Sequence, residues 1–260
     1  MSVAGTFVMK LKDRIAVVTG GGTGIGRAIS HLFAREGATV VVNYSQSQAE
    51  AEEVARDICA NGGNAAAYRA DVRREADVKG MIAEVERRWG RLDVLMNNAG
   101  WSTRVPHHQL DALTDEIWDR TFDVNLRGLF YCVRAAVPLM RKQKGASIVN
   151  LVSSAAFHAA GSSMAYAAAK AGALSLTKSL ARVLAPDIRV NAVCPGLVRT
   201  RFAGWPEEAF EHGAKVTPLG RLATVEEVAQ AALFLAADAT AMTGEALLVD
   251  GGLYQLGRSR

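Results

Sequence analysis

Short apolar segments that alternate with longer amphipathic stretches constrain the fold of this chain more than any other feature. Seven segments have strand length and are almost continuously apolar, as strands buried on both faces are; they span residues 14–19, 39–43, 65–69, 94–96, 147–151, 188–193 and 246–249. Helical patterns lie between them, near residues 25–36, 47–61, 74–89, 115–143, 165–185 and 224–237. This alternation predicts an α/β fold, with a doubly wound parallel sheet of about seven strands and helices on both faces.

The pattern continues without a composition break or an internal repeat that would mark a second domain. Half of the 260 residues are hydrophobic, which is enough for one substantial core. We therefore expect one domain over residues 11–260, preceded by a loose N-terminal extension over residues 1–10. Residues 198–221 combine aromatic, charged and proline residues without a clear period. A long irregular excursion after a strand's carboxyl end predicts a substrate loop or lid.

Charge and cysteine content exclude several classes of protein. The net charge is only +4, and the 30 basic residues are scattered among 26 acidic ones, so we expect no nucleic-acid partner. No segment reaches the roughly 18 apolar residues of a membrane span, and none begins like a signal peptide, so we expect no membrane association. The three cysteines lack metal-ligand spacing and fit small buried residues of a reducing compartment. We predict a cytoplasmic protein without a metal site.

The first apolar segment leads directly into a glycine-rich turn that opens a helix. Glycines allow a tight turn and close backbone approach to a pyrophosphate, and the helix directs its free N–H groups at that anion. The order of strand, glycines and helix predicts a dinucleotide site, the alternative being a flexible loop without a ligand. The expected cofactor contacts in this turn are Gly20, Gly22, Thr23, Gly24, Ile25 and Gly26.

The end of the second apolar segment indicates which dinucleotide is bound. NAD enzymes usually place an Asp or Glu there for the ribose 2′-OH, but no carboxylate appears here before Glu50. We expect Tyr44 and Ser45, with the amide and hydroxyl groups that follow, to contact a 2′-phosphate. This favours NADP(H), with NAD(H) as the alternative; Arg27 or Arg69 would supply the positive charge.

Two further segment ends carry small or acidic residues suited to an adenosine. Asp71, with Val72, is placed to accept a hydrogen bond from the adenine amino group; its alternative role is an N-cap for the next helix. The run Asn98, Ala99 and Gly100 lets the backbone approach a cofactor, although taken alone it is ordinary turn chemistry.

Tyr166 and Lys170 lie one helical turn apart and therefore on the same helix face. A nearby ammonium favours the phenolate, so we expect Lys170 to lower the tyrosine pKa and make the pair a proton-transfer device. The alternative is a chance coincidence of two residues on one face.

Taken together, these motifs resemble the short-chain dehydrogenase/reductase family over nearly the whole chain. The matching residues, in the family's order and spacing, are Thr19, Gly20, Gly24, Ile25, Gly26, Asp71, Asn97 to Gly100, Asn125, Ser153, Tyr166, Lys170, Pro195, Gly196 and Thr200. The resemblance implies a single Rossmann-like domain, a nicotinamide cofactor and a homotetramer. It also implies hydride transfer between that cofactor and a carbonyl or secondary alcohol.

The family assigns roles to these positions. The catalytic serine is expected three residues after Asn150 and thirteen before Tyr166; both counts select Ser153, with Ser154 as the alternative. The resemblance implies that Asn125 bends its helix and holds a water near Lys170, which also binds the nicotinamide ribose. The nicotinamide ring would be held by Pro195, Gly196, Val198 and Thr200.

The substrate is less well determined by the sequence. By position we expect an aromatic, apolar pocket, formed by Trp101, Ser154, Phe157, His158, Phe202 and Trp205. The leading hypothesis is a ketone reductase or alcohol dehydrogenase acting on a small molecule. The alternatives are a 3-oxoacyl-carrier-protein reductase, a sugar dehydrogenase and, more remotely, a non-catalytic cofactor-sensing protein.

Overall fold

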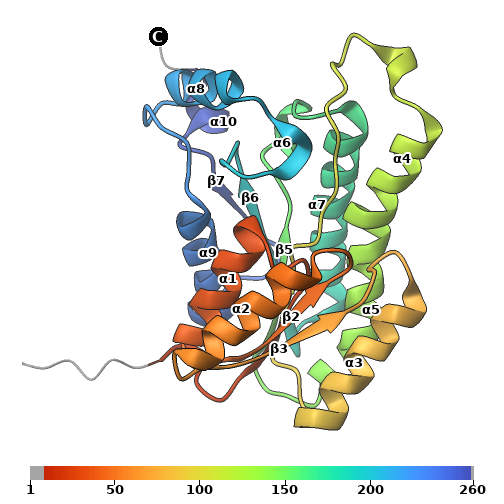
Figure 1. Cartoon of the computed structure of the whole chain (residues 1–260), viewed down its shortest axis with the longest axis vertical. Coiled ribbons are helices and arrows are strands. Elements are labelled where there is room, and N and C mark those ends of the chain that lie inside the picture. Colours follow the sequence, from red (N-terminus) through yellow and green to blue (C-terminus); the bar gives the residue numbers. More distant parts are fainter. Residues whose placement is uncertain (1–8, 259–260) are drawn as a thin grey trace, which may run out of the picture.

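A seven-stranded parallel sheet forms the centre of the molecule in the computed structural model, which describes residues 9–258 (Figure 1). The strand order is β3-β2-β1-β4-β5-β6-β7, and every neighbouring pair is parallel. The strands are β1 (Ile15–Val18), β2 (Thr39–Tyr44), β3 (Asn64–Arg69), β4 (Val94–Asn97), β5 (Ala146–Leu151), β6 (Ile188–Pro195) and β7 (Ala246–Val249). The predicted α/β fold and strand count are confirmed.

Helices cover both faces of this sheet. The longer ones are α1 (Gly24–Arg35), α2 (Gln48–Ala60), α3 (Glu75–Trp89), α4 (Asp115–Phe122), α5 (Gly128–Met140), α7 (Met164–Leu184), α8 (Glu207–Val216) and α9 (Val225–Leu233). One buried cluster packs α3, α5 and α7 on one face, and a second packs α1, α2 and α9 on the other. The central strands are buried on both sides, which explains why the sequence shows no alternation there.

The order of the strands determines where a ligand can bind. The chain runs from β1 outward to β3 and then returns to β4, so β1 and β4 are neighbours although two strand–helix units separate them in the sequence. The connections leaving their carboxyl ends diverge to opposite sides, which opens a crevice at this point. The topology therefore places the predicted glycine turn beside the segment that follows β4.

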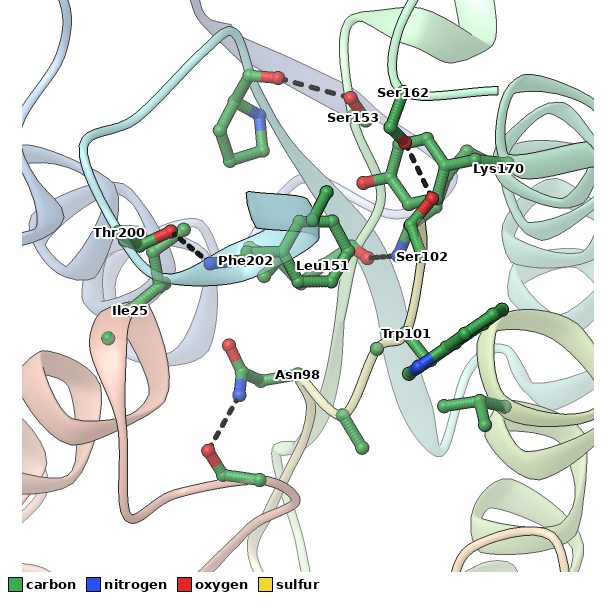
Figure 2. A pocket seen from close by; sticks show the side chains of 18 of the residues that line it. Ile25, Asn98, Trp101, Ser102, Leu151, Ser153, Ser162, Lys170, Thr200 and Phe202 are labelled. Carbon is green, nitrogen blue, oxygen red and sulfur yellow. Dashed lines mark hydrogen bonds between the residues drawn. The ribbon is translucent and has the colours of Figure 1, made fainter. Parts of the chain in front are cut away.

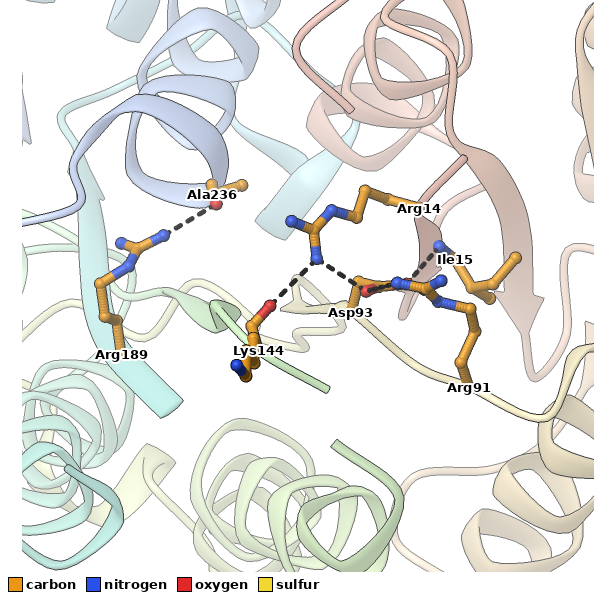
Figure 3. A network of polar contacts seen from close by, with 7 residues as sticks. All are labelled: Arg14, Ile15, Arg91, Asp93, Lys144, Arg189 and Ala236. Atoms are coloured by element: carbon orange, nitrogen blue, oxygen red, sulfur yellow. Dashed lines mark hydrogen bonds and ion pairs between the residues drawn. The ribbon is translucent and has the colours of Figure 1, made fainter. Parts of the chain in front are cut away.

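At the opposite, amino edge of the sheet, buried Asp93 binds two arginines (Figure 3). Its carboxylate accepts hydrogen bonds from Arg14 (2.9 Å), Arg91 (2.7 Å) and the backbone N–H of Ile15 (2.9 Å). Burial alone would raise the pKa of Asp93, but these donors outweigh burial and hold the pKa below its usual value. This network closes the amino edge and ties β1 to the loop before β4.

One expectation about helices is confirmed with a detail added, and another was wrong. The stretch 115–143 is helical from residue 115 to residue 140, with a five-residue π-helical segment, Asp123–Arg127, between α4 and α5. The stretch 198–221 is not irregular throughout, since it contains the 3₁₀ turn Phe202–Gly204 and α8. Helix α8 is only ten residues long and buries only Phe210, so its apolar residues are too few for the sequence to reveal the helix. Two four-residue helices, α6 (Ala155–His158) and α10 (Leu253–Leu256), were also missed.

The N-terminal segment and the cysteines agree only in part with the expectations from the sequence. Residues 1–8 of the expected extension lie outside the described residues, whereas the Lys10 ammonium pairs with Asp238 at 2.6 Å. Cys132 and Cys194 are buried as expected, but Cys59 is exposed. Within residues 9–258, no helix has both the length and the apolar character needed to cross a membrane.

Candidate active site

One cavity of about 940 Å³ lies at the carboxyl edge of the sheet and brings most of the predicted site residues together (Figure 2). It extends from the glycine turn and the end of β2 to the start of α7. The predicted catalytic and cofactor residues that line it are Gly20, Thr23, Gly24, Ile25, Tyr44, Ser45, Asp71, Val72, Asn98, Ala99, Gly100, Ser153, Tyr166, Lys170, Pro195, Gly196, Val198 and Thr200. Of the expected substrate pocket, it is lined by Trp101, Ser154, His158, Phe202 and Trp205.

Four predicted residues do not line this cavity. A Cβ on Gly22 would meet the Ala51 backbone at 2.9 Å, and one on Gly26 would meet the Gly20 carbonyl oxygen at 2.2 Å. These two glycines therefore allow the turn to pack against α2 and against itself. Phe157 instead packs on Tyr254, with ring centroids 5.1 Å apart. The fourth residue, Asn125, acts from behind the cavity wall, as described below.

The glycine turn is tied to the segment after β4. Asn98 Nδ2 donates to the carbonyl oxygens of Thr19 (2.8 Å) and Gly20 (3.0 Å), and Thr19 Oγ1 accepts from the backbone N–H groups of Asn98 and Ala99. Helix α1 begins after Thr23, whose side chain makes no capping hydrogen bond. The first N–H groups of α1 are therefore not capped by that side chain and point toward the cavity, as a pyrophosphate site requires.

At the adenosine end, Asp71 has a partner that the sequence did not reveal. Arg73 donates to both carboxylate oxygens of Asp71, at 2.6 Å and 3.0 Å, and thereby lowers the pKa of that carboxyl. The alternative of an N-cap is wrong, because α3 begins after Arg74 and Asp71 instead accepts the backbone N–H of Arg73. Two residues of opposite charge two positions apart give no signal of this kind in a sequence.

The positive charges near the end of β2 are not those expected. Arg27 points to Glu53 and Asp57 on α2, and neither Arg27 nor Arg69 lines the cavity. Arg73 and Arg201 do line it, together with Ser45, Gln46 and Ser47. Arg201 comes from the segment after β6 and pairs with Glu50 at 3.2 Å, a contact across more than half the chain.

The end of the cavity that holds the predicted catalytic residues, which we call the catalytic end, is built on the first turns of α7. Ser163 caps this helix by accepting the Tyr166 N–H at 3.2 Å, and Lys170 lies one turn further on. Lys170 Nζ donates to the Leu151 carbonyl oxygen at 2.7 Å and lies 5.6 Å from the centroid of the Tyr166 ring. The tyrosine ring also packs on Phe202, with centroids 5.6 Å apart.

The two adjacent serines differ in their contacts. Ser153 Oγ donates to the Pro195 carbonyl oxygen at 3.4 Å and shares a hydrogen bond with Tyr166. Ser154 Oγ instead lies 3.2 Å from His158 Nε2. Ser153 is therefore the serine that contacts the tyrosine hydroxyl.

The pKa of Tyr166 differs from the expectation. Burial raises it to about 12, although the hydrogen bond with Ser153 acts in the opposite direction, and burial lowers the pKa of Lys170 to about 8. The predicted lowering of the tyrosine pKa is therefore wrong for this structure. The lysine ammonium is directed at Leu151, and the loss of solvation is the largest influence on the pKa of each group.

Asn125 occupies the π-helical segment between α4 and α5. Its Nδ2 donates to the carbonyl oxygens of Trp101 (2.6 Å) and Thr121 (2.8 Å). Its Oδ1 is buried and has no hydrogen-bond partner among the described residues. That oxygen is the atom suited to hold a water behind the cavity wall.

Comparison with known proteins identifies the family to which this chain belongs. A family model described as enoyl-(acyl carrier protein) reductase matches residues 20–254. A crystal structure described as that of a short-chain dehydrogenase/reductase from Burkholderia xenovorans superposes with a TM-score of 0.87 at 36% identity, covering 92% of this chain and 97% of that one. The chain belongs to the short-chain dehydrogenase/reductase family.

Named members of this family differ in their substrates. The 3-oxoacyl-[acyl-carrier-protein] reductase FabG of Thermotoga maritima is 38% identical, over 94% of this chain and 99% of its own. A Rhizobium meliloti protein named "Probable galactose dehydrogenase GalD" is 40% identical, over 94% of this chain and 96% of its own. Both names describe oxidoreduction at CH–OH or C=O groups, which is the chemistry of the short-chain dehydrogenase/reductase family.

The residues present fit the nicotinamide cofactor that such dehydrogenases use. The cavity is lined by both the glycine turn and the start of α7, its glycine turn has no side-chain cap at Thr23, and its side walls are small at Ala99 and Gly100. The described residues contain no group of three or more His, Cys, Asp or Glu side chains that could hold a metal ion.

Proposed function

We propose that the protein is an NADP(H)-dependent ketone reductase or secondary alcohol dehydrogenase in which Tyr166 is the general acid/base. The observation that carries this proposal is the meeting of Ser153, Tyr166 and Lys170 in one cavity of about 940 Å³ that is also lined by the glycine turn and the end of β2. When bound, the nicotinamide supplies or accepts the hydride. The protein supplies orientation and handles the proton.

Each side chain of the catalytic end has a role in this proposal. Ser153 Oγ donates a hydrogen bond to the carbonyl oxygen of the substrate and polarises it. Tyr166 Oη gives its proton to that oxygen in reduction and removes it in oxidation. Lys170 supplies a proton to Tyr166 after the tyrosine has given up its own. The buried Oδ1 of Asn125 holds the water that links the lysine to solvent.

The remaining predicted residues bind the cofactor. The turn from Gly20 to Ile25 takes the pyrophosphate, and Asp71, oriented by Arg73, takes the adenine amino group. The nicotinamide ring lies against the segment from Pro195 to Thr200. NADP(H) is favoured over NAD(H), because the end of β2 offers Ser45 and its hydroxyl and amide neighbours, with Arg201 nearby and no carboxylate in the strand end.

Substitution of Tyr166 by phenylalanine tests the catalytic role. We expect kcat to fall on the order of 10²–10⁴-fold, because the general acid is lost while the ring remains in place. NADPH oxidation at 340 nm with a panel of ketones measures the rate, and fluorescence titration measures cofactor binding, which should persist. Tyr131→Phe on α5, outside the cavity, is the matched control. Full activity in Tyr166→Phe would exclude the proposed role.

Two named relatives support alternative substrates. The FabG relative of Thermotoga maritima favours a 3-oxoacyl thioester on an acyl carrier protein, and the Rhizobium relative favours a sugar. Turnover of an acetoacetyl carrier-protein thioester, or of galactose, at a rate far above that of simple ketones would select one of these. Tight cofactor binding with no turnover of any carbonyl would favour the cofactor-sensing alternative. A cytoplasmic homotetramer remains our prediction for its assembly and location.

A further inference from the structure

Arg120, on α4, is a cation in the cavity wall that the proposed mechanism does not use. Its guanidinium carbon lies 4.3 Å from the centroid of the Trp101 ring, and both residues line the cavity. Val124, one helical turn further along the same face, lines it as well. The guanidinium is thus held at the wall by an aromatic contact, and Figure 2 shows the Trp101 ring between the segment after β4 and the neighbouring helix.

Arg120 differs from the other arginines of this cavity in having no acidic partner. Arg73 is bound to Asp71, and Arg201 is paired with Glu50. Among residues 9–258, no carboxylate lies within ion-pair distance of Arg120. A guanidinium that stacks through its face keeps its in-plane N–H groups free, and these match the two oxygens of a carboxylate or phosphate.

The Arg120–Trp101 pair belongs to the catalytic end of the cavity. The Trp101 carbonyl oxygen accepts from Asn125, and the next residue, Ser102, shares a 2.6 Å hydrogen bond with Ser162 in the loop before Tyr166. The adenosine end, in contrast, is formed by the ends of β2 and β3. Arg120 is therefore tied, through Trp101, to the segment that carries Ser102 and to the loop before Tyr166.

A second arginine–tryptophan pair joins the segment after β4 to the segment after β6. The Arg104 guanidinium carbon lies 5.2 Å from the centroid of the Trp205 ring, and Trp205 lines the cavity. Within the described part of the chain, Arg104 also has no ion-pair partner. Trp101 and Trp205, which both line the cavity, thus each contact an arginine without an ion-pair partner among residues 9–258, although of these two arginines only Arg120 lines the cavity itself.

We propose that Arg120 determines substrate specificity by binding an anionic group, a carboxylate or a phosphate, of the carbonyl substrate. This inference rests on the proposed function and specifies its substrate class. The reacting carbonyl lies at Ser153 and Tyr166, the body of the substrate packs on the aromatic walls, and the anionic group lies at Arg120. Arg104 adds positive charge at the same end of the cavity.

Matched neutral and anionic ketones test this inference. The first pair is 4-acetylbenzoate with 4-acetylbenzamide, and the second is 4-acetylphenyl phosphate with 4-acetylphenol. In the unmodified enzyme we expect kcat/KM at least about tenfold higher for the anionic member, mainly through KM, because a charge-assisted hydrogen bond forms only with that member. The pair with the larger ratio shows whether the group is a carboxylate or a phosphate.

Variants of Arg120 test whether the preference for the anionic ketones depends on this residue. Arg120→Gln should lower the anionic-to-neutral ratio about 10–100-fold, and Arg120→Lys should restore part of it, because lysine keeps the charge without the planar donor pair. The control is Arg88→Gln, which removes an arginine that also lies over a tryptophan ring, Trp89, but outside the cavity. This control should leave the ratio as it is.

Several outcomes would overturn the inference. A ratio near one in the unmodified enzyme, or the same ratio in Arg120→Gln, would exclude an anion site at Arg120. A rise only in the dissociation constant of NADPH, measured by fluorescence titration, would assign the guanidinium to the cofactor. A loss confined to substrates on a carrier protein would assign it to protein docking. Reduction of none of the four ketones would instead reject the proposed function itself.

Discussion

At the scale of single residues, the main feature is a buried lysine, Lys170, beside the half-buried Tyr166 in the wall of the cavity. Lys170 is 3% exposed, and burial brings its pKa down to about 8 while raising that of Tyr166 to about 12. A buried ammonium destabilises the folded state, because the unfolded chain hydrates the charge fully. The residue is thus retained at a cost in stability, as is common for catalytic groups.

The variant Lys170→Met tests this cost. At pH 7 we expect its free energy of unfolding to exceed that of the unmodified protein by about 1–2 kcal/mol, since the lost hydrogen bond to Leu151 offsets part of the gain. Activity should fall sharply. Urea denaturation at several pH values, with activity assays in parallel, measures both effects.

The difference in unfolding free energy between Lys170→Met and the unmodified protein should depend on pH. The folded-state pKa of Lys170 is lowered, so between about pH 8 and 10.5 the unfolded state binds more protons and the unmodified protein gains stability as pH rises. The advantage of Lys170→Met should therefore shrink across this window. Tyr166 is present in both proteins, so its own titration cancels. The account would be contradicted if Lys170→Met were less stable than the unmodified protein at pH 7 and the two unfolding free energies did not converge at high pH.

At the scale of elements, the close packing of the glycine turn on α1 positions the phosphate-binding end of the cavity. Gly20 and Gly24 have positive φ angles of 62° and 51°, which glycine adopts without strain. Gly26 is needed for another reason, because it lies inside α1 directly against the Gly20 carbonyl. The turn and helix can approach this closely only if that position has no side chain.

A pair of glycine-to-alanine substitutions separates packing from helix propensity. Gly26→Ala should destabilise the protein by about 1–3 kcal/mol and weaken NADPH binding, because the new Cβ would lie 2.2 Å from the Gly20 oxygen. Gly80→Ala, in α3, should stabilise by about 0.5–1 kcal/mol, because its Cβ would meet only the Tyr68 hydroxyl at 3.6 Å. Thermal unfolding measures both. Equal effects in the two helices would contradict the packing argument.

At the scale of the whole molecule, the cavity joins parts of the chain that lie far apart in the sequence. Its walls come from both halves of the sheet and from the segment after β6, which is tied to α2 through Arg201 and Glu50. A ligand that fills this cavity binds only the folded state and therefore stabilises the whole domain.

Cofactor-dependent melting tests this idea together with the cofactor preference. NADPH at 100 times its dissociation constant contributes about 2.7 kcal/mol, which corresponds to a rise of about 5–10 °C in Tm for a chain of this size. The same concentration of NADH should give a smaller rise. Ser45→Asp should reverse the order, because a carboxylate at the end of β2 repels the 2′-phosphate and accepts from a 2′-OH. A larger shift with NADH in the unmodified protein would reject the preference for NADP(H).

Local patterns of residues were sufficient to predict much of this protein. Strand–helix alternation, the glycine turn and the spacing from Ser153 to Lys170 depend on neighbours within one or two turns or on the order of motifs, so they are visible in the sequence. They predicted the seven-stranded parallel sheet, the family and many of the residues that line the cavity.

Only the tertiary structure decided the environment of those residues. The Asp71–Arg73 pair, the replacement of Arg27 by Arg201 near the end of β2, and Arg120 on Trp101 arise from contacts made after folding. The pKa of Tyr166 moved against the expectation because burial is a property of the whole fold, whereas the sequence shows only the lysine one turn away. Periodicity and motif order are encoded locally, but desolvation and pairing of charges depend on which distant segments the sheet brings together.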